Sequence, residues 1–286
     1  MLSNKVSEIM TTDLVKAPVT ATVFSVMETM VVNDVGRIII TDDEVPVGIF
    51  TEKDVLKRVV GAQIDAKSTS IKFVMTAPVR AVREETLIVD AFARMYRGKY
   101  RHLLVRGRHG KIVGVVSMRR ILNIAVELGQ GISESRTLGD IANAPIVTVD
   151  ESSTVHEAVD LMNRQGLTAV VVTTAGKPAG IFTERDVLKR VATVESARLS
   201  APLKQVMTTP LVTMPRSALV GDVLAEMSRR DIRNMPVQDH ANELVGVVSM
   251  PEILQYAQAF NIDEQVRRSW QEVAKALDSD DQYTPG

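Results

Sequence analysis

The sequence predicts an α/β (α+β) protein made of four copies of one small unit, each with the order β-α-β-β-α. First, GIFTEKDVLKRV at Gly48–Val59 recurs as GIFTERDVLKRV at Gly180–Val191, with eleven of twelve residues identical and 132 positions between them. Second, the glycines that open related segments, Gly48, Gly114, Gly180 and Gly246, are 66 residues apart. Third, an amphipathic segment and then a β-branched run recur between these glycines. A repeat of this length decides the architecture, so the four copies are expected to share one fold.

Each copy begins with a short helical turn and an extended segment. Val6–Met10 and Phe73–Met75 are examples of the turn, and Leu14–Ala17 and Ile146–Val149 are examples of the extended segment. An amphipathic helix is predicted next, because apolar residues follow at the i, i+3, i+4 and i+7 spacing of one helix face. These stripes are Val23, Val26, Met27, Met30 and Val31 in copy one, Ile88, Ala91, Phe92, Met95 and Tyr96 in copy two, and Val220, Val223, Leu224 and Met227 in copy four. We interpret the methionines as core residues.

Two strands and a second helix complete the unit. The first strand is a continuous apolar run, which is typical of a sheet covered on both faces. These runs are Ile38–Ile40, Leu103–Val105, Ala169–Val172 and Met235–Val237. The second strand ends in the repeated glycine segment, after which Asp54–Val60 and Asp186–Ala192 are expected to be helical. Thr51 and Thr183 stand just before these helices, where a side-chain oxygen can cap free backbone N–H groups.

Turn-rich segments lie between the copies. Residues 61–70 join copies one and two, residues 196–202 join copies three and four, and residues 129–136 separate the two pairs. We expect module 1 at 1–130, with copies at about 3–62 and 69–128, and module 2 at 131–259, with copies at about 135–194 and 201–258. Residues 260–286 are expected to form a C-terminal helix and a flexible acidic tail, whose role the sequence does not assign.

The composition excludes several classes of protein. The chain has 286 residues, of which 45% are apolar and 24% charged, and a net charge of −1 gives no general attraction to nucleic acid or anionic membranes. Cysteine is absent, which excludes disulfides and thiolate catalysis. There is no membrane-length apolar run and no signal-peptide pattern, so we expect a cytoplasmic protein. Because we find no nucleophile–base set, no phosphate-binding glycine loop and no metal-ligand spacing, we expect no enzyme, catalytic cofactor or metal.

A unit of this length with Gly-hydrophobic-hydrophobic-Thr/Ser-x-x-Asp between a strand and a helix resembles the cystathionine β-synthase (CBS) domain. The resemblance covers about residues 3–258 in four copies. It implies that the copies pair through their sheets into two Bateman modules. The chain is therefore similar to prokaryotic stand-alone proteins with four CBS motifs and to the gamma subunit of AMP-activated protein kinase. The resemblance also implies regulatory binding of adenosine-containing ligands in clefts between paired copies, without chemistry on them.

The repeated segment offers groups that suit such a ligand. A carboxylate can accept both hydroxyls of a ribose, and hydrogen bonds to a charged group are each worth about 1.5–3 kcal/mol. A hydroxyl and a helix N-terminus can donate to phosphate. These groups are Thr51 and Asp54 in copy one and Thr183 and Asp186 in copy three. The structural alternative is that each aspartate only complements the helix dipole, which is worth about 0.3–1 kcal/mol.

Copies two and four depart from this pattern. Ser117 and Ser249 keep the hydroxyl, but Arg120 and Glu252 stand at the carboxylate position. Arginine cannot accept a hydrogen bond, and glutamate is one methylene longer than aspartate. We therefore predict that the copy-two cleft is empty of nucleotide and that the copy-four cleft is weak or empty.

The resemblance implies that basic residues before the first buried strand of the partner copy hold the ligand's phosphates. Copy two has Arg101 and His102 there, and copy four has Arg233 and Asn234, whereas copies one and three have Gly36-Arg37 and Thr168-Ala169. Site 1 is therefore predicted to contain Thr51, Asp54, Arg37, Arg101 and His102, and site 2 to contain Thr183, Asp186, Arg233 and Asn234. A solvated charge at a strand edge is the structural alternative for Arg101 and Arg233.

The two sites are expected to differ in charge. Arg94–Arg120 holds nine Lys or Arg and no acid, whereas Glu226–Glu252 holds three basic and five acidic residues. Because clustered positive charge concentrates multivalent anions, site 1 is expected to prefer di- or triphosphates and site 2 to prefer AMP-like ligands.

The leading prediction is a sensor of AMP, ADP or ATP that signals to an effector protein, which the sequence does not identify. S-adenosylmethionine is an alternative ligand, because it shares the adenosine moiety. Nucleic-acid binding through Arg94–Arg120 is a second alternative, although the net charge and the 4% aromatic content count against it. A structural adaptor without ligands is a third. No membrane partner is expected, and a homodimer is compatible with the sequence.

Overall fold

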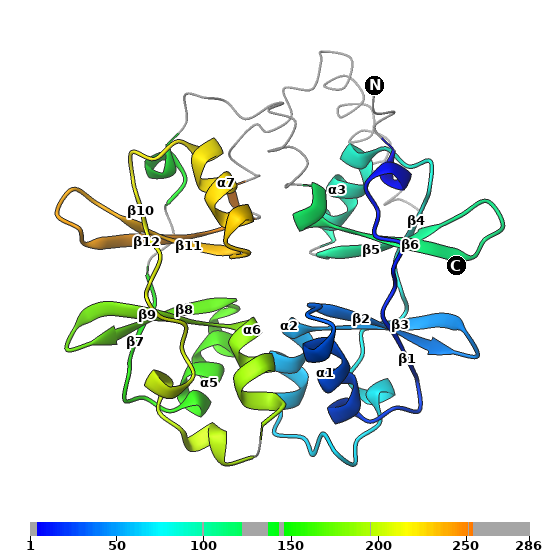
Figure 1. The fold of residues 1–286 in the computed structure, drawn as a ribbon, viewed down its shortest axis with the longest axis horizontal. Coiled ribbons are helices and arrows are strands. Elements are labelled where there is room, and N and C mark those ends of the chain that lie inside the picture. The colour runs from blue at the N-terminus through cyan, green and yellow to red at the C-terminus, as the bar shows by residue number, and fades with distance from the viewer. Residues whose placement is uncertain are drawn as a thin grey trace, which may run out of the picture.

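The computed structural model describes residues 5–98, 100–121, 137–142, 146–194, 196–250 and 252–253. The predicted linker at 129–136 and the C-terminal segment 260–286 lie outside the described residues. Four three-stranded sheets, each with its helices, are arranged around a ring with their strand hairpins pointing outward (Figure 1). The predicted α/β architecture of four repeated units is confirmed.

The longer elements follow the repeat. Copy one contains β1 (Lys16–Pro18), α1 (Val23–Val32), β2 (Arg37–Asp42), β3 (Val45–Thr51) and α2 (Glu52–Asp54). Copy two contains β4 (Ala81–Arg83), α3 (Ile88–Arg97), β5 (His102–Arg106) and β6 (Ile112–Ser117). Copy three contains β7 (Thr148–Asp150), α5 (Val155–Gln165), β8 (Ala169–Thr174), β9 (Lys177–Thr183) and α6 (Glu184–Asp186). Copy four contains β10 (Met214–Pro215), α7 (Val220–Arg229), β11 (Asn234–Gln238) and β12 (Leu244–Ser249).

Short helical turns connect these elements. Two π-helical turns, η2 (Val55–Val60) and η5 (Val187–Ala192), continue α2 and α6 directly. A 3-10 turn leads each copy: η1 (Val6–Glu8), η3 (Ile71–Phe73), η4 (Leu138–Asp140) and η7 (Leu203–Gln205), while η6 (Ser196–Ser200) precedes the last of them. The helical segment predicted from Asp54 begins at Glu52, because the Asp54 carboxylate accepts the Thr51 N–H at 2.9 Å and closes the first turn.

Every sheet has the same topology. The first strand runs parallel to the second, and the second runs antiparallel to the third, so that Ile39 pairs with Lys16 on one side and Ile49 on the other. A helix makes the crossover that a parallel connection requires. Ile39 packs with Leu104 and Val115 of copy two, while its strand neighbours face the helices of copy one. The sheets of copies one and two therefore pack against each other.

The leading turn of each copy packs in the core of its partner copy. Val6 lies in the apolar cluster of copy two, and Ile71 lies in that of copy one. Backbone pairing fixes the exchange, because Thr11 pairs with Val115 of copy two and Thr76 pairs with Ile49 of copy one. In module 2 the corresponding turns η4 and η7 pack with copies four and three. A single copy therefore lacks part of its own core.

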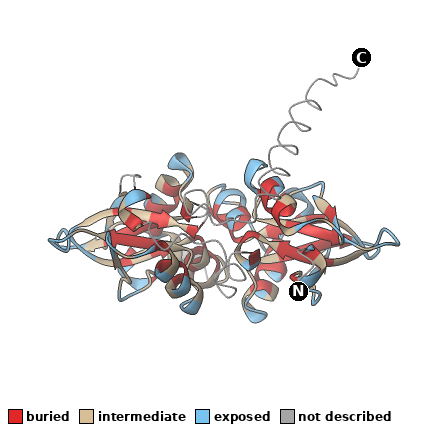
Figure 2. Cartoon of the chain, turned by 90° about the horizontal axis from the view of Figure 1, so that it is seen from above, coloured by how far each residue is buried: buried red, intermediate tan, exposed pale blue. Residues whose placement is uncertain are grey.

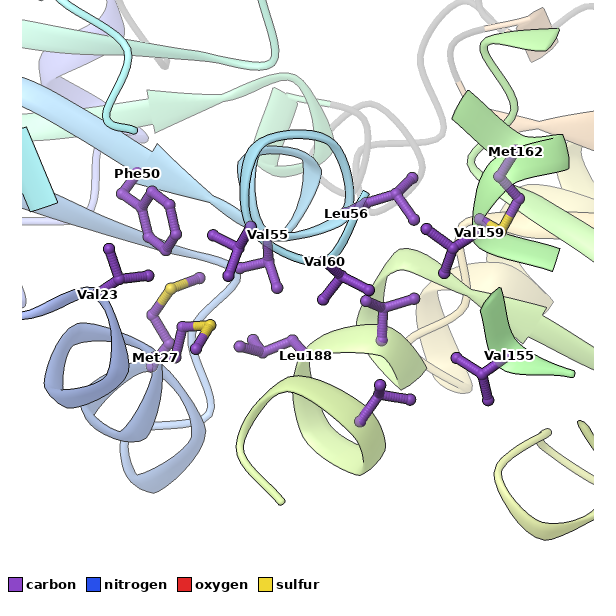
Figure 3. Packing of buried hydrophobic residues seen from close by; sticks show 14 of the residues in the cluster. Val23, Met27, Phe50, Val55, Leu56, Val60, Val155, Val159, Met162 and Leu188 are labelled. Carbon is purple, nitrogen blue, oxygen red and sulfur yellow. The ribbon is translucent and has the colours of Figure 1, made fainter. Parts of the chain in front are cut away.

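The two modules also share cores. The apolar residues of copies one and three form one cluster, and those of copies two and four form another. Figure 3 shows Leu56, Val60 and Leu188 between Met27 of copy one and Val159 of copy three. Seen from above, buried residues fill the interior of each half and the outer tips are exposed (Figure 2). Among the described residues, no helix has the length and apolar character needed to cross a bilayer.

The exchange of leading turns predicts that a core substitution in a turn destabilises the partner copy. Ile71 in η3 is fully buried among copy-one residues, so Ile71→Ala should lower the free energy of unfolding by about 2–5 kcal/mol, as other large-to-small core changes do. Phe73, in the same turn, is 72% exposed, and Phe73→Ala should change it by about 0.5 kcal/mol or less. Urea unfolding measures both values. Hydrogen exchange should show that Ile71→Ala loosens β2 of copy one before β5 of copy two, and the reverse order would contradict the exchange.

Candidate functional site

Asp54, a residue that is only 7% exposed, joins copies one and two through its carboxylate. Its Oδ2 accepts the Thr51 N–H at 2.9 Å and the Thr51 hydroxyl at 2.7 Å. Its Oδ1 accepts the hydroxyl of Thr76, from copy two, at 3.1 Å and lies 3.4 Å from a guanidinium nitrogen of Arg58. Two hydroxyl donors from neighbouring copies therefore meet on one carboxylate.

Asp186 has the same environment in module 2. Its Oδ2 accepts from the backbone N–H and hydroxyl of Thr183 at 2.9 and 2.7 Å. Its Oδ1 accepts from the hydroxyl of Thr208, in copy four, at 2.9 Å, and Arg190 lies 3.4 Å away. The two predicted carboxylate sites thus have equal geometry, and each lies where the leading segment of one copy crosses its partner.

Sequence reasoning missed Thr76 and Thr208. The signal was present, because Val-Met-Thr-x-Pro occurs at 74–78 and again at 206–210, with the spacing of the longer repeat. What the sequence did not show is that these segments pair with β3 and β9, through Thr76–Ile49 and Thr208–Ile181. That pairing places each threonine beside an aspartate of the other copy.

The two divergent positions differ from each other. In copy four, Glu252 accepts the backbone N–H of Ser249 at 2.7 Å and its hydroxyl at 2.6 Å, so it caps its own helix. In copy two, the Arg120 N–H donates to the Ser117 hydroxyl at 3.1 Å, and the Arg120 side chain is exposed. The weak or empty state of these two clefts stays a prediction.

Arg101 and Arg233 both lie at the junction of the two modules. The guanidinium of Arg101 donates to both carboxylate oxygens of Glu184, at 2.8 and 3.3 Å. Arg233 forms an ion pair with Glu52, which also lies 3.3 Å from Arg185 Nε. Each arginine predicted to hold phosphate in one module is therefore paired with a glutamate of the other module. Asn234, predicted beside Arg233, accepts the hydroxyl of Thr168 at 3.0 Å.

Glu52 and Glu184 are buried carboxylates that the sequence analysis did not identify. Their side chains are 3% and 5% exposed. Burial by itself raises the pKa of Glu52, but Arg233 and then Arg185 outweigh it and lower that pKa below its usual value. The repeat indicated that these positions are buried, because the equivalent positions in copies two and four hold apolar residues, Met118 and Met250, which are themselves buried.

Further ion pairs join the copies around this junction. Lys189 of copy three contacts Asp34 of copy one at 2.5 Å. Asp231 of copy four pairs with Arg119 of copy two and with Arg185 of copy three. Gly36 leaves room for this network, because a Cβ there would lie 3.0 Å from a guanidinium nitrogen of Arg233. Within the described residues, no group of three or more acidic or histidine side chains is placed to hold a metal ion.

Arg37 and His102, both predicted for site 1, are half-buried near the junction. Burial lowers the pKa of His102 well below its usual value, and the charges of Arg37, Arg101 and Arg233 lower it further. Burial and Arg233 also lower the pKa of Arg37. His102 is therefore a neutral donor and acceptor at neutral pH, surrounded by cations.

The sequence matches the family described as "CBS domain" at residues 6–61, 70–127, 138–193 and 203–259. The CBS domain-containing protein CBSCBSPB1 of Arabidopsis thaliana is 26% identical in an alignment 284 positions long, which covers 85% of this chain and 51% of that protein. The chain thus spans about half the length of this curated relative.

Two solved structures are also similar. Protein MJ1225 of Methanocaldococcus jannaschii, described as a proposed archaeal homologue of g-AMPK, matches 88% of this chain and 99% of its own with a TM-score of 0.77 and 17% identity, which shows the fold. The CBS domain protein PAE2072 of Pyrobaculum aerophilum, solved with AMP, is 28% identical and matches 41% of this chain and 88% of its own with a TM-score of 0.38.

The environment of His102 predicts a pH dependence. An unfolded histidine has a pKa of about 6.5, and the folded value is lower, so the unfolded state takes up the proton first as the pH falls. Stability from this residue is present above about pH 6.5 and is lost below it. When the pH is lowered from about 7 to about 5.5, the free energy of unfolding should therefore fall less in His102→Gln than in the parent. Urea unfolding should show a difference between the two falls of up to about 1 kcal/mol.

The exposed His240 provides the control for this experiment. His240→Gln should follow the parent at each pH. An equal pH dependence of the parent and His102→Gln would show that His102 is not held neutral by its surroundings.

Proposed function

Since this chain belongs to the CBS domain family, we propose that it is a regulatory protein that binds adenine nucleotides (AMP, ADP or ATP). The nucleotides bind between paired copies, and the protein signals their presence to a partner protein. The observation that carries the proposal is the pair of threonine hydroxyls, one from each copy, on the Asp54 and Asp186 carboxylates.

This arrangement suits a ribose. The two hydroxyls of a ribose diol can replace the hydroxyls of Thr51 and Thr76 on Asp54, so the buried carboxylate stays paired at each stage. The replaced threonine hydroxyls then become free to donate to phosphate. Because this exchange replaces one pair of hydroxyl–carboxylate hydrogen bonds with another, it adds little net affinity. Most of the net affinity has to come from the base and the phosphates.

The cationic side chains around Asp54 are positioned to bind the phosphates of the nucleotide. Arg101 lies close enough to Asp54 for their charges to interact, and Arg37 and Arg101 lie close enough to influence His102. Site 2 has Arg233, with Asn234 in place of the histidine, beside Thr168 and Ala169. This difference supports the expectation that site 1 prefers di- or triphosphates and site 2 prefers AMP.

The same arginines supply a way to signal. Arg101 belongs to module 1 and is paired with Glu184 of module 2, and Arg233 of module 2 is paired with Glu52 of module 1. A phosphate that binds Arg101 competes with Glu184 and weakens a contact between the modules. A ligand shifts a conformational equilibrium only through such a difference between states. We infer that the module junction changes with the charge of the bound nucleotide.

Replacing the aspartates tests the sites. Asp54→Ala and Asp186→Ala should each weaken nucleotide binding by about 1–3 kcal/mol, or about 5- to 150-fold, because each removes charged hydrogen bonds to the sugar. Calorimetric titration of the full chain with AMP, ADP, ATP and S-adenosylmethionine measures this. Asp186→Ala, which leaves site 1, should favour ATP over AMP more strongly than Asp54→Ala does.

Glu157→Ala is the matched control, since Glu157 makes the same cap with Thr154 at the exposed start of α5. It should leave nucleotide affinity unchanged. If none of the nucleotides binds at millimolar concentration, the sensing proposal fails, and tighter binding of S-adenosylmethionine would replace the nucleotide with that ligand.

Replacing Glu184 tests the competition between glutamate and phosphate. Glu184→Met places at this position the residue that copies two and four carry, and it frees Arg101. We expect the free energy of unfolding to fall and ATP affinity at site 1, measured in the Asp186→Ala background, to rise by at least about threefold, because charged hydrogen bonds of this kind are worth about 1.5–3 kcal/mol.

Glu226→Met is the control, because Glu226 pairs with Arg229 and Arg230 on the exposed side of α7. It should leave ATP affinity unchanged. Unchanged or weaker ATP binding by Glu184→Met would show that Arg101 does not hold phosphate.

A further inference from the structure

A concave site lies on copy two, and its lining includes neither Asp54 nor the ion-paired residues of the module junction. It is a pocket of about 400 Å³ beside β4, within the range of small-molecule sites. Its lining residues are Val79, Ala81, Val82, Arg83, Thr86, Arg94 and Arg106. None of these residues belongs to either predicted nucleotide site.

Three arginines line this pocket. Arg83 of β4 is the direct register partner of Arg106 in β5, and Arg94 comes from α3. All three are exposed, and within the described part of the chain none of their guanidinium groups has an ion-pair partner. Like charges placed side by side on neighbouring strands are destabilising. A bound anion would reduce the repulsion between these guanidinium groups.

The repeat supplies an internal comparison, since the sheet registers identify the equivalent positions in the other copies. Where copy two has Arg83 and Arg106, copy one has the pair Pro18 and Thr41, copy three has Asp150 and Thr173, and copy four has Pro215 and Gln238. At the helix position of Arg94 the other copies have Thr29, Leu161 and Glu226. The scaffold therefore folds without a basic residue at any of these positions, and the set of three is particular to copy two.

The surroundings favour a compact anion over an extended one. The arginines are bordered by acids, because Glu84 and Glu85 follow Arg83 directly and lie 3.6 and 3.9 Å from Arg108. Val79, Ala81 and Val82 add apolar surface to the lining of the pocket. Guanidinium groups bind phosphate oxygens in pairs, which gives geometric specificity for phosphate groups.

From these observations we propose that the pocket of Arg83, Arg94 and Arg106 binds the di- or oligophosphate group of a small molecule, at a site separate from the nucleotide clefts. The apolar wall contacts the non-phosphate part of the same molecule. The site is independent of the proposed function, since it uses neither aspartate.

The probe is inorganic tripolyphosphate, titrated calorimetrically into the full chain. Arg83→Gln, Arg94→Gln and Arg106→Gln should each weaken its binding about tenfold, because each removes a charge-assisted contact. Arg97→Gln is the matched control, being exposed and on the same helix but outside the pocket lining. It should change the affinity less than about twofold, since it removes only distant charge. Arg101→Gln separates this site from the nucleotide clefts and should leave the pocket's affinity unchanged.

The outcomes are distinguishable. If Arg97→Gln weakens binding as much as the pocket variants do, the attraction is diffuse and the proposal fails. If Arg101→Gln abolishes binding while the pocket variants do not, the phosphate sits in a nucleotide cleft and the proposal fails. If a single-stranded oligonucleotide binds more tightly than tripolyphosphate and Arg97→Gln weakens that binding equally, the surface is a nucleic-acid interface. The side chains of Arg83, Arg94, Arg97 and Arg106 are exposed, so thermal unfolding should show these four variants folded, and Arg106→Gln no less stable than the parent.

Discussion

Two almost fully buried glutamates join the four copies. Glu52 and Glu184 stand directly after the capping threonines of α2 and α6, and each is at most 5% exposed. A carboxylate this far from water needs a cation and further hydrogen bonds. For both residues the cation is an arginine of the other module, Arg233 for Glu52 and Arg101 for Glu184. The relative placement of the modules therefore depends on charge pairing as well as on the shared apolar clusters.

This constraint connects stability with ligand binding. The cations that neutralise the glutamates are the ones we propose for phosphate, so an anionic ligand and the junction compete for the same groups. His102 belongs to the same balance, because burial and, after it, the charges of the surrounding guanidinium groups keep its pKa low and its ring neutral. The aspartates are different, since their partners come from within one module. The sugar contacts that we propose are thus local to each module, whereas the phosphate contacts that we propose are shared between the modules.

Much of this structure could be predicted from the repeat, and the reason is physical. Periodicity locates α1, α3 and α7 and the buried strands, because these depend on neighbours within about ten residues. It also located Thr51, Asp54 and their counterparts, since they lie on one helical turn. Thr76 and Glu52 were missed, because their environment comes from chain crossings that periodicity does not contain. A buried glutamate and a surface glutamate look alike in sequence, and only the methionines at the equivalent positions of copies two and four distinguish them.

Because the leading turns are exchanged within a pair, the pair is the smallest piece that can be added to this chain without leaving a turn unpaired. A single added copy would have a leading turn without a partner core and a core without a leading turn. A pair doubled together gives two closed cores at once. The sequence agrees with duplication of a pair. The segment at Gly48 matches that at Gly180, in the other module, at eleven of twelve positions. By contrast, GIFTEKDVL and GVVSMRRIL, from the two copies of one module, share only their glycine and final leucine. The heritable unit is the closed core rather than the shortest repeat.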